Sequence, residues 1–216
     1  MTTTRLCLIR HGETDWNTER RFQGHTDIPL NARGELQARQ MAQALKDTAI
    51  TFDDLYTSDL KRAADTANAV AQLFSVKAQV ESTLRERHFG ALQGLLISEA
   101  PLIRPDIWQA HSTRNLDHEL EGGESIQQFA LRVQNALDMI QERHSGKTIL
   151  LVSHGGTLEM MYRIASNQAL STERAVSVPN ASLNWITHRQ GEGWSVEQWA
   201  DTRHLNGPAL ENVEHY

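Results

Sequence analysis

The segment TILLVS, at Thr148–Ser153, is apolar on both of its faces. Such a strand is typical of the centre of a parallel sheet, because helices cover both sides of that kind of sheet. Arg5–Arg10 has the same character, and Asp54–Thr57 and Lys77–Glu81 are shorter strand candidates. The chain must therefore also supply helices for both faces of these strands.

Helical segments alternate with the strands. Apolar residues three or four positions apart give the segment Glu124–His144 one apolar face, which is typical of a helix packed on a sheet. We expect the other helices at Asn31–Lys46, with Asn31 as N-cap, at Ser58–Phe74 and at Gly155–Ala165. A hairpin is predicted where Leu183–His188 and Trp194–Trp199 flank QGEG.

This alternation predicts an α/β fold: a three-layer sandwich with a mainly parallel central sheet flanked by helices. With 216 residues, the chain suits a single domain over residues 1–216. The region 95–123 fits no strand–helix unit, since Pro101 and Pro105 interrupt it. We expect this region to form a small cap or insertion.

Composition limits the classes of function. The apolar fraction is 39% and the net charge is −6, which is typical of a globular protein and argues against general nucleic-acid binding. Cys7 is the only cysteine, so an intrachain disulfide is impossible. The start of the chain is too short in apolar residues for a secretory signal of ~7–15, and no run approaches the ~18 of a membrane helix. A cytoplasmic location without membrane partners is expected, as monomer or homodimer.

Polar residues follow three of the predicted strands directly. Arg10 and His11 end the first strand, Ser58 and Arg62 follow the second, and His154 follows TILLVS. Ligands of open α/β sheets bind beyond the carboxyl ends of the strands. The sequence therefore brings basic groups from three distant parts of the chain to one edge of the sheet.

These residue types suit the chemistry of a phosphate monoester. An arginine fork can bond two phosphate oxygens at once and keeps its charge, so Arg10 and Arg62 would form a clamp. A neutral histidine nitrogen, that of His11, can attack phosphorus and carry the phosphoryl group. Gly155-Gly156 open a helix beside His154, and its first amides could donate to the oxyanions.

The leaving oxygen needs a proton, and Glu86 in LRERHFGALQGL is the carboxyl group available for it. The same group could then take a proton from the attacking water. In the alternative interpretation, Glu86 is a structural ion-pair partner of Arg85 or Arg87.

Taken together, these segments resemble the histidine phosphatase superfamily, also called the phosphoglycerate mutase-like family. The resemblance covers most of the chain in order. It is carried by LIRHGET (Leu8–Thr14), WNTERRFQGHTDIPLNARG (Trp16–Gly34), SDLKRAADTA (Ser58–Ala67), LRERHFGALQG (Leu84–Gly94, here called the acid loop), GGES (Gly122–Ser125) and VSHGG (Val152–Gly156).

The resemblance implies a role for each matching position. His11 would be the nucleophile, Glu86 the proton donor, and Arg10, Arg62 and His154 the phosphate pocket. Asn17, Gln23, Gly24 and Gly155 would lie on the substrate side, facing a small phosphorylated substrate. No metal and no cofactor is implied.

Three functions remain open, and a phosphomonoester hydrolase with a phosphohistidine intermediate is favoured. The acid loop looks like the mutase form, but mutases carry a longer insertion with two adjacent arginines, whereas Arg104 and Arg114 stand apart here. Mutases also tend to have asparagine where this chain has Gly156. The alternatives are therefore a phosphoglycerate mutase-type phosphotransferase and a non-catalytic module that binds phosphorylated ligands, although a binder needs neither nucleophile nor acid.

Other chemistries fail on spacing. A cysteine phosphatase needs arginine six positions after Cys7, where Glu13 stands, and a serine hydrolase needs glycine in place of Leu151 before Ser153. No HExxH pair is present. Five histidines lie in polar stretches and are expected to be solvated, namely His111, His118, His144, His188 and His215.

Overall fold

The structure is a computed structural model that describes residues 2–173 and 176–210. The strands are β1 (Thr3–Arg10), β2 (Asp54–Thr57), β3 (Gln79–Val80), β4 (Thr148–Ser153), β5 (Leu183–Arg189) and β6 (Gly193–Asp201). The α-helices are α1 (Asp15–Thr18), α2 (Ala32–Asp47), α3 (Lys61–Phe74), α4 (Ala100–Ile103), α5 (Pro105–Ser112), α6 (Ile126–Arg143) and α7 (Gly155–Ala165). Two 3₁₀ turns, Ser82–Leu84 and Gly90–Leu92, lie between β3 and α4.

The strands form one sheet in the order β3-β2-β4-β1-β5-β6. β1, β2, β3 and β4 run parallel, whereas β5 and β6 form an antiparallel hairpin that pairs with β1. The third strand is shorter than the predicted Lys77–Glu81 and pairs with β2 alone. The mainly parallel sheet and the terminal hairpin are as predicted.

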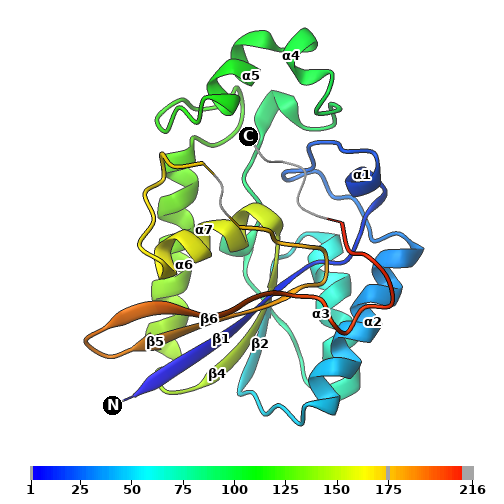
Figure 1. The fold of residues 1–216 in the computed structure, drawn as a ribbon, viewed down its shortest axis with the longest axis vertical. Coiled ribbons are helices and arrows are strands. Elements are labelled where there is room, and N and C mark those ends of the chain that lie inside the picture. The colour runs from blue at the N-terminus through cyan, green and yellow to red at the C-terminus, as the bar shows by residue number, and fades with distance from the viewer. Residues whose placement is uncertain (1, 174–175, 211–216) are drawn as a thin grey trace.

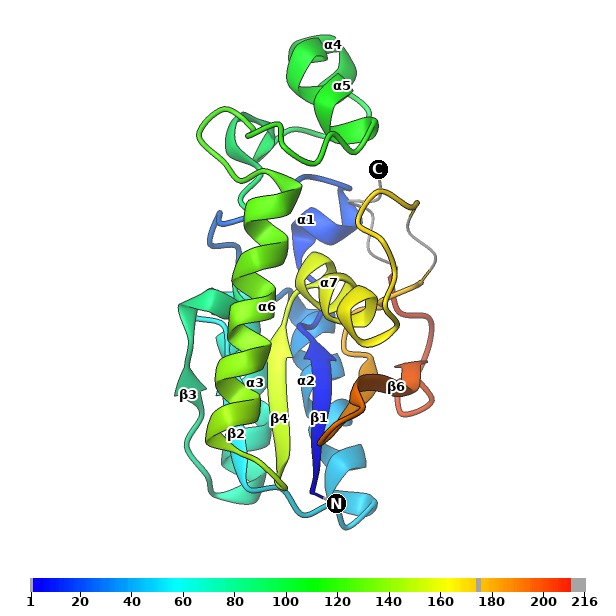
Figure 2. The same cartoon turned by 90° about the vertical axis from the view of Figure 1, so that its left-hand side faces the viewer.

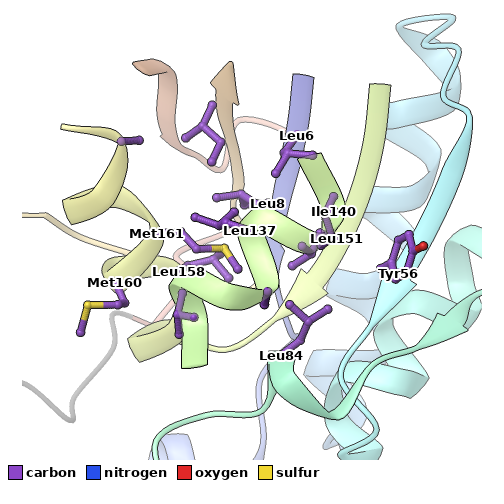
Figure 3. Close-up of a cluster of buried hydrophobic side chains, with 14 of the residues drawn as sticks. Leu6, Leu8, Tyr56, Leu84, Leu137, Ile140, Leu151, Leu158, Met160 and Met161 are labelled. Carbon is purple, nitrogen blue, oxygen red and sulfur yellow. The ribbon is translucent and has the colours of Figure 1, made fainter. Parts of the chain in front are cut away.

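Helices cover both faces of this sheet. Leu6 and Leu8 of β1 point to the face covered by α6 and α7, while Cys7 and Ile9 point to the face covered by α2 and α3. Figure 3 shows the first of these clusters, where Leu8 lies near Leu137 of α6. The three-layer sandwich is therefore confirmed (Figure 1).

Two helices begin later than predicted. The second predicted helix was expected from Ser58, but α3 begins at Lys61 because Leu60 is still extended, with φ −67° and ψ 133°. The helix expected from Glu124 begins at Ile126, since the Ser125 side chain caps its first turn. In both cases the residues before the helix keep their side chains for other contacts.

The region 95–123 holds α4 and α5, which lie above the carboxyl ends of β1 and β4 (Figure 2). It has an apolar cluster of its own, separate from the two clusters on the sheet. Four residues of this region are buried in it, namely Ile97, Ala100, Ile107 and Leu120. Phe22 and three residues of the acid loop, Phe89, Ala91 and Leu92, belong to the same cluster.

The C-terminal segment, whose place the sequence left open, returns to the carboxyl edge of the sheet. After β6, the His204 ring lies 3.0 Å from the Ala181 carbonyl, and Arg33 donates to the Pro208 carbonyl. The Asn180 N–H donates to the Leu210 carbonyl at 2.9 Å. Among the described residues, no helix combines the length and the apolar character needed to cross a membrane.

Candidate active site

The carboxyl edge of the sheet brings three predicted site segments together. β1 and β4 end side by side, with Arg10 opposite Ser153, and the His11 N–H donates to the Ser153 carbonyl at 2.9 Å. β2 ends on the other side of β4, which places Ser58 at the same edge. The rings of His11 and His154 have centroids 5.2 Å apart. The convergence expected from the strand ends is therefore present.

His11 is held with one ring nitrogen ready to attack. Its Nδ1 lies 2.7 Å from the Gly12 carbonyl, which can only accept, so Nδ1 carries the proton and Nε2 keeps its lone pair. The side chain is 3% exposed. Burial, with the charges of Arg62 and Arg10, holds the pKa of His11 well below its usual value. The imidazole is therefore neutral at neutral pH, as a nucleophile must be.

His154 is the residue before α7 and is also neutral. Burial lowers its pKa first, and the positive charges of Arg62 and Arg10 lower it further. Its Nε2 lies 2.9 Å from Ser58 Oγ. Because the Leu60 N–H donates to the same oxygen at 3.3 Å, the Ser58 hydroxyl proton is free to point at Nε2. In that arrangement the proton of His154 lies on Nδ1, an atom without a hydrogen-bond partner among the described residues.

The two arginines of the predicted clamp are buried, each 1% exposed. Arg10 donates through Nη1 to the Val178 carbonyl at 2.6 Å. Arg62 donates to the carbonyls of Thr26 and Gly24 at 3.0 and 2.8 Å. Both charges also depress the pKa of His11, so both guanidinium groups contribute to a positive potential at its ring.

Glu86 faces the same site from the acid loop and is 2% exposed. Its Oε2 accepts from the Gly156 N–H at 2.8 Å, and its Oε1 accepts from the Arg87 N–H at 2.9 Å. The ion pair with Arg85 or Arg87 is not formed, because the Arg85 side chain pairs with Asp59 at 2.7 Å and Arg87 donates to the Glu124 carbonyl at 3.1 Å. The carboxylate is therefore bound by backbone amides rather than neutralised by an ion pair.

This contact changes one sequence-based expectation. Both Gly155 and Gly156 were expected to offer their amides to a phosphate, but the Gly156 amide is taken by Glu86. A β-carbon on Gly156 would lie 2.4 Å from Glu86 Oε1, so the glycine makes room for the carboxylate. The start of α7 thus positions the acid.

The residues predicted for the substrate side lie around α1 and the loop after it. Asn17 Oδ1 accepts from the Thr14 N–H at 3.0 Å, so Nδ2 is the group that Asn17 can offer to a ligand. Gln23 Oε1 lies 3.1 Å from Thr14 Oγ1, and Gly24 presents its carbonyl to Arg62. Asn17 and Gln23 are 3% and 2% exposed, and both contact Thr14.

Two contributors were missed or undervalued by sequence reasoning. Asn180 donates through Nδ2 to the His11 carbonyl at 3.0 Å, and Ser58 contacts His154. Asn180 lies just before β5, and β5 runs antiparallel to β1. The beginning of an antiparallel strand meets the carboxyl ends of its parallel neighbours, which is the signal that would have identified this residue.

His25, from the segment Trp16–Gly34, packs against His88 of the acid loop. Their rings pack edge to face with centroids 4.5 Å apart. His25 Nε2 lies 2.7 Å from the Glu86 carbonyl and therefore carries a proton. Burial lowers the pKa of His25 to about 4. His25 therefore supports the backbone of the acid.

The prediction of solvated histidines was wrong for two residues. His111 is 3% exposed and packs edge to face on Phe22 and Phe89, because α5 turns it into the apolar cluster of the cap region. His144 is 7% exposed and bonds Tyr56 Oη at 2.9 Å. His118 is exposed, His188 is half-buried, and His215 lies outside the described residues.

Comparison with known proteins identifies the family to which this chain belongs. Residues 6–202 match the model of the histidine phosphatase superfamily, branch 1. This chain therefore belongs to that superfamily, and within the described residues no group of three His, Cys, Asp or Glu side chains is arranged for a metal ion.

Three known proteins are similar to this chain over most of its length. The chain is 38% identical to phosphoglycerate mutase-like protein 4 of Arabidopsis thaliana, over 93% of this chain and 86% of that protein. It is 37% identical to a metal-independent phosphoserine phosphatase of the same plant, over 94% and 84%. A solved phosphoserine phosphatase of Entamoeba histolytica, in complex with 3-phosphoglyceric acid, superposes with a TM-score of 0.82 at 28% identity, over 94% of this chain and all of that one. The prediction of a histidine-type phosphatase is confirmed at the level of class.

Proposed function

We propose that this protein hydrolyses small phosphate monoesters through a phosphohistidine at His11. The observation that carries the proposal is the arrangement of one neutral histidine with a free Nε2, two buried guanidinium groups and an amide-bound carboxylate at one edge of the sheet. Phosphoryl transfer needs positioning and compensation of charge more than covalent chemistry from the protein, and this site supplies both.

In the first step, His11 Nε2 attacks phosphorus and the bond between phosphorus and the ester oxygen breaks. Glu86, in its protonated form, gives its proton to the leaving oxygen. Arg10 and Arg62 compensate the charge on the equatorial oxygens. With its Nε2 accepting from the Ser58 hydroxyl and its proton on Nδ1, His154 donates to one of these oxygens through Nδ1–H.

In the second step, water attacks the phosphohistidine and the bond between phosphorus and Nε2 breaks. The ionised Glu86 takes the proton of the water, and phosphate leaves. His11 returns to its neutral form, with Nδ1–H still bound to the Gly12 carbonyl. The cycle consumes one water and leaves the enzyme unchanged.

The residues that recognise the substrate lie around this centre. Asn17, Gln23, Gly24 and Gly155 contribute from the edge of the sheet, and residues 95–123 form the cap of the single domain. The phosphoserine and 3-phosphoglyceric acid named for the relatives suggest a small phosphorylated acid as the substrate class. A cytoplasmic location, as monomer or homodimer, agrees with this class.

A hydrolase agrees better with the cap than the mutase alternative does. A mutase that uses a bisphosphorylated cofactor needs two neighbouring arginines for the second phosphate. Here Arg104 pairs with Glu121, while Arg114 donates to the Leu170 carbonyl at 3.0 Å beyond α7. The two guanidinium groups serve different parts of the molecule.

The test is phosphate release from phosphoserine, phosphoglycerates, sugar phosphates, nucleotides and an aryl phosphate, with a chelator present. We expect hydrolysis in the wild type, and no release above background in His11→Ala. Acid-labile label on His11 from a ³²P substrate would identify the intermediate. Transfer of phosphate without release would favour the mutase, and tight binding without turnover would favour the non-catalytic module.

A further inference from the structure

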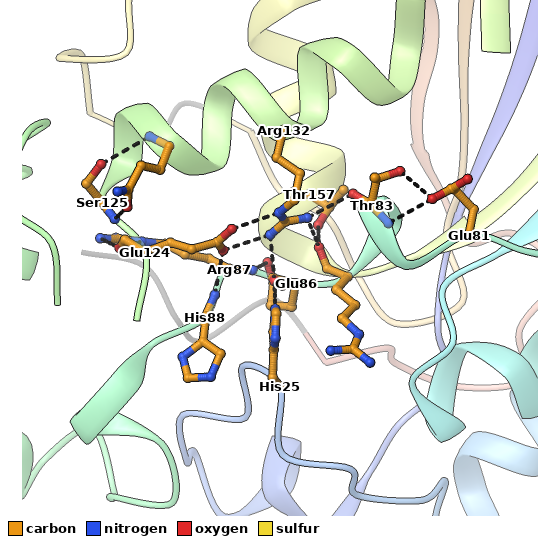
Figure 4. Close-up of polar contacts among 12 residues, drawn as sticks. His25, Glu81, Thr83, Glu86, Arg87, His88, Glu124, Ser125, Arg132 and Thr157 are labelled. Atoms are coloured by element: carbon orange, nitrogen blue, oxygen red, sulfur yellow. Dashed lines mark hydrogen bonds and ion pairs between the residues drawn. The ribbon is translucent and has the colours of Figure 1, made fainter. Parts of the chain in front are cut away.

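The acid loop is attached to α6 through one arginine. Arg132 donates through Nη1 to the carbonyls of Thr83 and Arg85, at 2.8 and 2.9 Å, and through Nη2 to the carbonyl of Glu86 at 3.0 Å. Figure 4 shows this side chain reaching from the helix to the loop. Three carbonyls within four residues, the last of them that of the acid itself, share one guanidinium group.

The same guanidinium group is fixed from its other side by Glu124. Arg132 Nε and Nη2 donate to the two carboxylate oxygens of Glu124, both at 2.8 Å. With the three carbonyls, these contacts engage all five N–H groups of the arginine. The charged head also lies 5.0 Å from the centre of the Phe129 ring, one turn earlier in α6. The arginine thus has a single geometry in which every donor is used.

Glu124 holds the residues that follow the acid. Its backbone carbonyl accepts from Arg87 Nε and Nη2, at 3.1 and 2.8 Å, and its Oε2 accepts from the His88 N–H at 2.8 Å (Figure 4). Burial raises the pKa of Glu124, but the hydrogen bond from Arg132 outweighs it and the net shift is downward. The ionised pair therefore brackets Glu86, one partner before it and one after it.

We propose that Arg132 and Glu124 are positioning residues that hold the carboxyl group of Glu86 at the leaving oxygen of the substrate. The inference rests on the proposed role of Glu86 as proton donor. Neither side chain touches the phosphate pocket in this arrangement, so both act through the acid loop. Residues 85–88 belong to no helix or strand, so these side-chain contacts add to the few backbone hydrogen bonds of the segment, such as that from the Glu124 N–H to the His88 carbonyl at 2.9 Å.

The leaving group of the substrate separates this role from a general structural one. An alkyl ester needs its leaving oxygen protonated, whereas the acidic phenol of an aryl phosphate leaves with little help. A general acid contributes about 10²–10⁴-fold, and a misplacement of about 1 Å can cost 10²-fold. Displacing Glu86 should therefore damage alkyl phosphate hydrolysis selectively. kcat/KM is the quantity to compare, because it reports the steps up to departure of the leaving group.

The experiment compares Arg132→Gln with Arg143→Gln, on phosphoserine and on p-nitrophenyl phosphate. Arg143 is the matched control, since it ends the same helix and is exposed. For Arg132→Gln we expect kcat/KM to fall about 30-fold or more on the alkyl ester and about 3-fold on the aryl ester. Glu86→Gln gives the full size of this selectivity. Arg143→Gln should leave both values unchanged.

Equal losses on the two esters, or no loss, would overturn the proposal. Titration of active sites with ³²P-labelled phosphohistidine corrects each value for misfolded protein. Should Arg132→Gln fail to fold, Arg132→Lys and Glu124→Gln provide the same comparison. A lysine keeps the charge but cannot reproduce the planar fork, so the same selectivity is expected at smaller size.

The outcomes also separate this proposal from the proposed function. If the wild type formed no phosphohistidine, or if Glu86→Gln showed no preference between the two esters, the proposed chemistry would be wrong. If Glu86→Gln were selective and the Arg132 and Glu124 variants were not, only the positioning role would be lost.

Discussion

Arg62 shows how one residue can serve both chemistry and structure. Sequence analysis predicted it only as part of a phosphate clamp. In the structure the side chain is 1% exposed and donates to the carbonyls of Gly24 and Thr26. A clamp residue that also satisfies two buried or half-buried carbonyls is tied to the loop that it serves.

Arg62→Ala should therefore reduce both activity and stability. We expect a fall in kcat of about 10²-fold or more from lost charge compensation. We also expect a loss of about 1–3 kcal/mol for each carbonyl left without a donor, measured by urea denaturation. Arg39→Ala is a control, because this arginine is 62% exposed and outside the pocket. Full stability of Arg62→Ala would show that the carbonyl contacts contribute nothing.

Site residues that follow a predicted strand were easier to predict than residues that reach the site from a distant helix. His11, Arg62 and His154 each follow a strand, so the rule for strand ends places them together. Arg132 lies in the middle of an amphipathic helix, and its partners Thr83 and Glu86 are more than 40 positions away. Nothing in the spacing of a helix distinguishes such an arginine from one that faces solvent.

At the scale of elements, the strand ends and helix starts decide where the chemistry lies. Strand positions were predictable from apolar runs, because burial on both faces leaves a clear pattern. Helix starts were less predictable. The predicted helix began at Ser58, but the Ser58 side chain contacts His154 instead. The start of α7 at Gly155 was right, but the use of its amides was not, since one of them binds Glu86.

Gly156→Ala tests the contact between α7 and the acid loop. Its β-carbon would lie 2.4 Å from Glu86 Oε1, so the carboxylate must move, with losses of stability and of alkyl phosphate hydrolysis. In a Glu86→Ala background the same change should stabilise the protein, by up to about 1 kcal/mol, because alanine is the better helix former. Thermal denaturation of the four proteins measures the coupling. The same sign in both backgrounds would contradict this account.

At the scale of the whole molecule, the sequence did not predict the order of the strands or the return of the C-terminal segment to the carboxyl edge of the sheet. The sequence predicted a mainly parallel sheet, but β5 pairs with β1, the first strand, only because of long-range packing. This pairing brings Asn180 to His11, and the segment after β6 brings Leu210 to Asn180. Residues from nearly both ends of the chain therefore meet at the site.

The packing of buried neutral histidines gives the whole molecule a sensitivity to acid. His111 in the cap region has its pKa lowered to about 3, by burial first and then by Arg87 and Arg114. In the unfolded chain it would titrate near 6.5. Because the unfolded state binds the proton more readily, stability is full above pH 6.5 and falls as the pH drops from there toward 3. The buried His11 and His154 have the same sign.

His111→Phe should therefore reduce the loss of stability in acid. The ring would remain among Phe22, Phe89 and Trp108, and no proton could bind it. Between pH 7.5 and 5.0, one such histidine accounts for about 2 kcal/mol, or a shift of about 4–8 °C in Tm for a chain of this size. The difference in Tm between the two pH values should shrink by that amount in His111→Phe and stay unchanged in His118→Gln, whose histidine is exposed. An equal acid loss in His111→Phe and the wild type would mean that the folded protein protonates His111 at no cost, and that its buried position does not govern the pH dependence.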